Sequence, residues 1–82
     1  MMSGKEPIDV EIRVTTGGVI TPLRFTWRKS WYSVAQIGRM WADEEGEHWL
    51  VLAAYPNLTV ELIHTPDNAW LALQRAARPS MV

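Results

Sequence analysis

The stretch IDVEIRVTTGG, residues 8–18, decides the fold class of this 82-residue chain. Its first seven residues alternate apolar and polar side chains, which is the pattern of a β-strand with one buried and one solvated face. The paired glycines at its end supply the positive φ angles of a tight hairpin, so the next strand is expected to run antiparallel. Leu23, Phe25 and Trp27 repeat the alternation in that next strand.

The segment after this hairpin has an irregular apolar spacing. Between Trp31 and Trp41 the intervals separating apolar residues change from two to three and then to four. A strand with a bulge near Gly38 fits this spacing and is the favoured interpretation. The alternative is a short helix over residues 35–45 that ends at Gly46.

Three regions in the second half of the chain complete the predicted pattern. Residues 48–54 are apolar on both faces, as expected of a central strand that is covered on both sides. Residues 58–64 alternate again with their even-numbered apolar residues inward, and a last strand covers about residues 70–74. Turns are expected at residues 43–47, 55–57 and 65–68.

About six short strands at regular spacing predict an all-β fold. We expect a small antiparallel barrel or a strongly twisted meander, specifically an SH3-like barrel, because closure removes exposed strand edges. The five tryptophans lie in or beside the predicted strands and are expected to supply much of the core. A single domain is expected over residues 1–82, with an ordered core at about residues 8–75 and flexible termini.

Composition narrows the function classes. A formal net charge of −1 provides no basic field of the kind that draws proteins to nucleic acids or anionic membranes. The chain has no cysteine, which excludes disulfides, a cysteine zinc site and a thiol nucleophile. No apolar stretch follows the charges near the N-terminus, so we expect neither a signal peptide nor a membrane anchor, and a cytoplasmic location.

The sequence contains few residues in patterns typical of catalysis, and we expect a non-catalytic protein without a cofactor or a small-molecule substrate. No serine lies in a nucleophile elbow, and no glycine-rich stretch carries the lysine of a phosphate-binding loop. The densest group of potential metal ligands is Glu44, Glu45, Glu47 and His48. Neighbours within one turn are better explained as a solvated loop, so no metal site is expected. His64 is expected in the core or at its rim, and the alternative is a pocket.

A basic and aromatic surface is the best candidate for binding. Its residues are Arg24, Arg28, Lys29 and Trp31, with Arg13 on the neighbouring strand. Basic groups beside an exposed ring can hold a phosphate backbone and stack one base. The favoured alternative is that the arginines pair across the hairpin with Asp9 and Glu11, because the whole chain is slightly acidic. Trp31 is expected to cap the barrel, and the alternative is an exposed anchor for a protein partner.

The order of the aromatic residues resembles a known family. The elements of the pattern are Phe25-x-Trp27-Arg28, Tyr32-x-Val34-x-x-Ile37-x-x-x-Trp41, Trp49, Glu61-Leu62 and Trp70. Spread over about residues 8–74, they resemble a family of small bacterial β domains of unknown function, some of which are encoded beside error-prone DNA polymerase and related repair genes. The resemblance implies a compact β domain and a genomic neighbourhood linked to DNA repair.

Two functions are therefore expected. The first is a protein-interaction or accessory module of a bacterial cytoplasmic assembly, which acts through an aromatic patch or an exposed strand edge. Its partner is expected to be another protein or a second copy of the chain. The alternative is a nucleic-acid-binding accessory domain linked to DNA repair, which predicts salt-sensitive binding.

Overall fold

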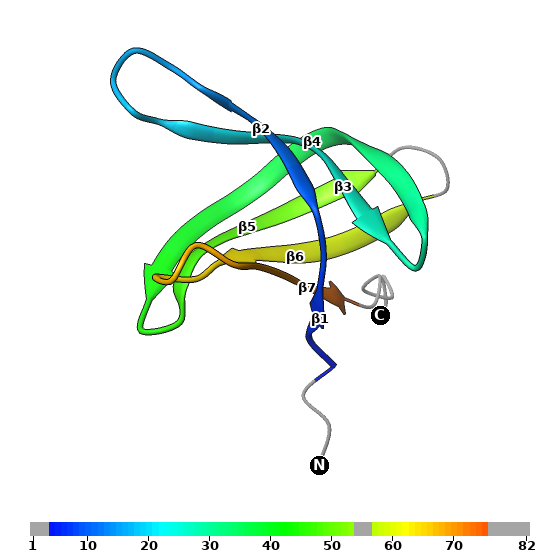
Figure 1. Cartoon of the computed structure of the whole chain (residues 1–82). Coiled ribbons are helices and arrows are strands. Elements are labelled where there is room, and N and C mark those ends of the chain that lie inside the picture. The colour runs from blue at the N-terminus through cyan, green and yellow to red at the C-terminus, as the bar shows by residue number, and fades with distance from the viewer. Residues whose placement is uncertain (1–3, 54–56, 76–82) are drawn as a thin grey trace, which may run out of the picture.

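The structure is a single antiparallel sheet that curls on itself (Figure 1). The computed structural model describes residues 4–53 and 57–75. The strands within these ranges are β1 (Glu6–Pro7), β2 (Val10–Val14), β3 (Ile20–Trp27), β4 (Ser30–Asp43), β5 (Gly46–Ala53), β6 (Leu58–His64) and β7 (Trp70–Arg75). The described residues form no helix, so none of them belongs to a helix that could cross a membrane.

The strands form a meander, and the N-terminal segment runs from one edge of it to the other. Strands β2 to β7 are neighbours in chain order, and β1 pairs with β7. Only residues 8–9 separate β1 from β2, although these two strands lie at opposite ends of the order. In Figure 1 this segment crosses in front of the sheet from β2 down to β1 beside β7. The expected all-β antiparallel fold is confirmed.

The sequence predicts the first strand over residues 8–14, but β2 begins only at Val10, and β1 is an additional strand ahead of the predicted range, which raises the number of strands to seven. The chain changes partner between β1 and β2: the Ile8 N–H donates to the Trp70 carbonyl at 3.1 Å, and the Asp9 carbonyl accepts from the Thr26 N–H at 2.9 Å. Sequence alternation continues through this point because it records the face of each residue and not the partner strand.

Two turns differ in detail from expectation. In the first hairpin only Gly18 has a positive φ, of 82°, and its N–H donates to the Thr15 carbonyl at 2.8 Å. This hairpin projects from the sheet in Figure 1, which leaves Val14 exposed although the alternation directed it inward. In the next turn Arg28 leaves the predicted strand, because Arg28 and Lys29 adopt positive φ angles of 52° and 74°.

The bulged-strand interpretation of the irregular segment is confirmed, and the helix alternative is wrong. Register shifts against β5 occur between Val34 and Gln36 and between Ile37 and Arg39. Ala35 and Gly38 therefore have no partner in β5 and are the extra residues of two bulges. These bulges bend the long strand, so that its two halves pair with different neighbours.

The concave face of the sheet holds the core. Its buried apolar residues are Phe25, Trp27, Trp49, Val51, Ala53, Leu58, Val60, Leu62 and Ala72. Only two of the five tryptophans are among them, and Trp70 packs half-buried against them. The prediction that Leu58, Val60 and Leu62 point inward is confirmed.

The convex face also contains buried residues where β5 and β6 lie at the centre of the sheet. Ile63 is 0% exposed, and the polar residues His48 and Glu61 are 2% and 5% exposed. The expectation that residues 48–54 are covered on both sides holds only in part: His48 is buried on the convex face, but Leu50 and Leu52 on that face are partly exposed. Residues 54–56, and the tail expected beyond Arg75, lie outside the described residues.

Candidate functional site

Part of one edge of β4 has no partner strand among the described residues. Residues 30–33 of β4 pair with β3, whereas its pairing with β5 begins at Val34. From residue 34 to residue 43, no strand within residues 4–53 and 57–75 pairs with the other edge of β4. Figure 1 shows this half of β4 along the margin of the sheet.

Both bulges lie in the first part of this open edge. After the second bulge, residues 39–43 pair in unbroken register with β5, from Arg39 opposite Leu50 to Asp43 opposite Gly46. We call residues 39–43 the edge segment. Bulges disturb the ladder and hinder further pairing, whereas a regular strand presents its N–H and C=O groups at even spacing. The edge segment is thus the part of the open edge best able to accept another strand.

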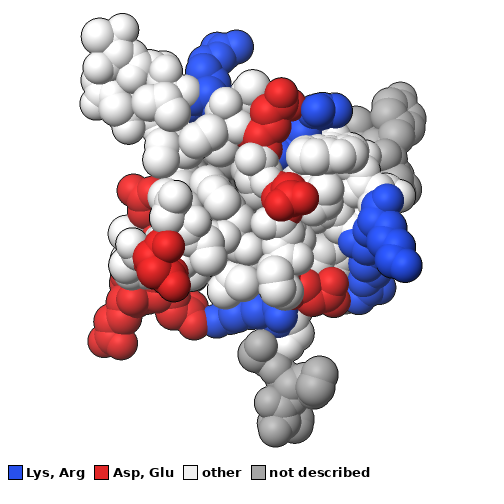
Figure 2. Space-filling view, in the orientation of Figure 1, with Lys and Arg blue, Asp and Glu red and all other residues white. Residues whose placement is uncertain are grey.

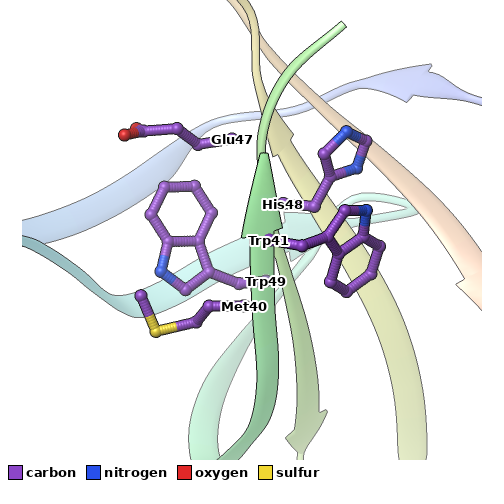
Figure 3. A pocket seen from close by; sticks show the side chains of 5 residues that line it. All are labelled: Met40, Trp41, Glu47, His48 and Trp49. Carbon is purple, nitrogen blue, oxygen red and sulfur yellow. The ribbon is translucent and has the colours of Figure 1, made fainter. Parts of the chain in front are cut away.

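A small pocket adjoins the edge segment. It has a volume of about 250 Å³ and is lined by Met40, Trp41, Glu47, His48 and Trp49. Figure 3 shows Met40, Glu47 and Trp49 on one side of the sheet and Trp41 and His48 on the other. Met40 is opposite Trp49 in the register and is 58% exposed. The buried indole N–H of Trp49 has no acceptor among the described residues.

On the convex face, His48 is held between two carboxylates. Its Nε2 lies 2.7 Å from Asp43 Oδ1, and its Nδ1 lies 2.6 Å from Glu61 Oε2. Trp41 stacks on the imidazole, with ring centroids 4.9 Å apart and an interplanar angle of 8°. Arg75 Nη1 donates to Glu61 Oε1 at 2.7 Å. We call Asp43, His48, Glu61 and Arg75 the histidine network, and it links four neighbouring strands.

This arrangement favours the doubly protonated imidazole. Both carboxylates are acceptors, so both ring nitrogens can donate only when His48 is charged. Burial by itself lowers the pKa of His48, but the hydrogen bonds to Asp43 and Glu61 outweigh it and raise that pKa above 6.5. The hydrogen bonds from His48 and from the Glu45 N–H lower the pKa of Asp43.

The acidic turn beside this network does not bring together the four potential metal ligands considered from the sequence. Instead, one ligand atom from each of Asp43, Glu45 and His48 lies within 4.8 Å of the others. These groups are already engaged: Glu45 pairs with Lys5, and Asp43 pairs with His48. Glu47 lies on the other side of the sheet from His48 (Figure 3). The contacts account for this cluster as a hydrogen-bonded turn.

The structure brings the residues of the predicted basic and aromatic surface close together, and acidic side chains pair with some of its arginines. The Arg24 guanidinium lies 4.6 Å from the Trp31 ring centroid, and Arg24 Nε donates to Glu11 Oε1 at 2.6 Å. Arg28 stacks on Trp27 at 4.9 Å. Its predicted acidic partners were Asp9 and Glu11, but the structure instead has Arg28 Nη2 3.8 Å from Glu6 Oε2.

Trp31 lies on the surface and does not cap the barrel, contrary to the favoured expectation. It is 49% exposed, because it lies on the convex face opposite Thr26. Lys29 is also exposed, in the turn that follows β3. Figure 2 shows basic groups at the right, over this turn, and acidic groups at the lower left, over the turn between β4 and β5. Neither sign forms a continuous field on this face.

His64 lies at the rim of the core, as expected. Its ring stacks on Trp70 with centroids 4.5 Å apart, and its Nε2 lies 2.8 Å from Asn68 Oδ1. Glu47 Oε1 is 3.6 Å from His64 Nδ1. These contacts give His64 a structural role in the turn after β6.

Sequence reasoning missed Asp43, Glu61 and Arg75 as partners of His48. The one available signal was a glutamate within the apolar run of β6, at a position that the sheet buries. A buried carboxylate requires a charged or hydrogen-bonded partner. The spacing of residues along the sequence could not identify that partner, because it depends on how the strands are paired in register.

We compared the chain with known protein families, curated proteins and solved structures. No family model matches the chain, and no curated protein or solved structure is significantly similar to it.

Proposed function

We propose that this chain is a non-catalytic protein-interaction module that accepts an extended segment of a protein partner along the edge segment of β4. The observation that carries the proposal is that residues 39–43 pair in unbroken register with β5, while their other edge has no partner strand among the residues that the structure describes. An exposed strand edge binds extended chains through main-chain hydrogen bonds, and alternate side chains provide specificity.

The side chains around the edge segment support the same use. Met40 is exposed beside the pocket, and the small residue Ala42 leaves the neighbouring edge accessible. A strand laid against β4 would cover the exposed Met40 side chain. The histidine network would hold the other side of the β4 and β5 hairpin rigid while the partner binds.

A peptide titration observed by NMR tests this function. The probes are acetylated and amidated seven-residue peptides of alternating Val and Thr, with Lys at one end and Glu at the other. The controls carry a central Pro, which lacks a backbone donor. We expect saturable shifts of the amides of residues 39–43 with the first set and not with the second. Shifts elsewhere only, or equal shifts with both sets, would contradict the proposal.

The second candidate is nucleic-acid binding, favoured by the half-exposed Trp31 beside Arg24. A base could stack on this ring while Arg28 and Lys29 contact the phosphate backbone. The acidic groups that already pair with Arg24 and Arg28 weaken this candidate relative to the first.

Fluorescence anisotropy with labelled single-stranded DNA at low and moderate salt tests the second candidate. Salt-dependent binding that disappears in the Arg24→Ala, Arg28→Ala double variant would support it. Absence of binding at low salt would remove it. A bacterial cytoplasmic setting, and any link to DNA repair, are supported only by the family resemblance of the aromatic spacing.

A further inference from the structure

We infer that the partner of the edge segment is a second copy of this chain, paired antiparallel about a two-fold axis at Trp41. This inference rests on the proposed function, because it uses the same open edge. Its starting point is the sequence Arg39-Met40-Trp41-Ala42-Asp43, which is complementary to itself when two copies run in opposite directions.

The charges at the two ends of the edge segment match in this register. With Trp41 opposite its own copy, Arg39 lies opposite Asp43 of the second copy, and Asp43 lies opposite Arg39. A two-fold interface repeats each contact twice, so both ends of the paired strands carry an opposite-charge pair. Opposite charges directly across an antiparallel pair stabilise it, and like charges destabilise it.

In this register, side chains that lie opposite each other are on the same face of the paired sheets. Arg39 lies over Trp41 at 5.1 Å, and both Trp41 and Asp43 contact His48, so the three side chains share the convex face. Met40 and Ala42 alternate with them and share the concave face. Each Met40 then meets an Ala42 of the other copy, which pairs a large side chain with a small one.

The groups needed for the pairing are accessible. Arg39 and Ala42 are exposed, and the Asp43 side chain is 48% exposed although its Oδ1 faces His48. Trp41 stacks flat against His48 and is partly exposed. A five-residue pairing is small compared with the interface of a stable dimer, so the association is expected to be weak and concentration-dependent.

Sedimentation across a concentration series up to the millimolar range is the first test. In Arg39→Glu, two opposite-charge pairs become two like-charge pairs, and we expect dimerisation to weaken about thirty-fold, equivalent to about 2 kcal/mol. Arg13→Glu makes the same charge change at an exposed arginine on β2, and its dimerisation is expected to match that of the unaltered chain. A chain that stays monomeric throughout, or an equal effect of the two variants, would overturn the self-pairing.

Cysteine cross-linking tests the register independently of Arg39, and the chain has no cysteine to interfere. A mixture of Met40→Cys and Ala42→Cys under mild oxidation is expected to form the mixed disulfide dimer faster than Ala42→Cys alone forms its own dimer. Equal rates would reject the register centred on Trp41. If the chain is monomeric but the Val and Thr peptides still shift residues 39–43, the self-pairing fails and the proposed function stands; if neither occurs, both fail.

Discussion

The substitution Glu61→Gln tests whether the histidine network stabilises the sheet. Glu61 is 5% exposed and bridges His48 and Arg75. Glutamine keeps the size of the side chain but removes its charge. The bond to buried His48 is charge-assisted and contributes roughly 1.5–3 kcal/mol, whereas the half-exposed Arg75 pair contributes less than about 1 kcal/mol.

Glutamine can still form neutral hydrogen bonds, which offset about 1 kcal/mol of this loss. The expected net loss in the free energy of unfolding is therefore about 2 kcal/mol, or roughly 8–16 °C in Tm for a domain of this size. Urea unfolding followed by tryptophan fluorescence measures it. Glu47→Gln, in an exposed carboxylate, is the matched control and is expected to change stability by less than about 0.5 kcal/mol.

The pH dependence distinguishes this network from simple packing. The pKa of His48 is raised in the folded state, so its contribution to stability is complete below about pH 6.5 and is lost as pH rises through the folded pKa. Glu61→Gln removes one cause of that rise. The difference between the two proteins is thus expected to be largest near pH 5.5 and to shrink toward pH 9. A loss below about 0.5 kcal/mol at pH 5.5, or one independent of pH, would refute the reasoning.

Three further substitutions, the first with a matched control, test the fold and the histidine network. Gly46→Ala places a Cβ 2.1 Å from the His64 carbonyl oxygen at a φ of 133°, so chemical unfolding is expected to show a loss of at least about 3 kcal/mol, whereas Gly17→Ala, with no atom within 4 Å, changes little. Leu62→Ala removes a fully buried side chain, and calorimetry is expected to show a loss of about 3–5 kcal/mol; a loss below about 1 kcal/mol would contradict its place in the core. The lowered pKa of Asp43 gives stability above about pH 3.8 that is lost as pH falls through the folded pKa, so Asp43→Asn is expected to flatten the acid limb of a stability-against-pH curve. An unchanged acid limb would contradict this prediction.

Much of the fold could be predicted from local patterns. Alternation identified the strands that carry Phe25, Trp27, Val60 and Leu62, and all four residues are buried. The slip in spacing correctly indicated a bulge near Gly38. The change of partner at residues 8–9, between β1 and β2, was not predictable, because the alternation of residues 8–14 does not record which strand each residue contacts.

The candidate site was less accessible to sequence reasoning. The sequence predicts an exposed strand edge as one possible interaction surface, but nothing in the spacing of β4 shows that β3 stops pairing with it after Ser33. His48 was considered only as a member of the acidic turn. Its buried hydrogen-bond partner is Glu61, 13 residues away, and that contact exists because the two strands pair at the centre of the sheet.

The sequence by itself determined which residues form strands and which of their faces are apolar, because the two-residue period of a strand is a local property. Only the tertiary structure decided which strand lies beside which. The bridging of the two sheet edges by the N-terminal segment, the open edge segment and the histidine network all follow from that choice. They depend on the register of residues far apart in the chain, which short-range spacing does not encode.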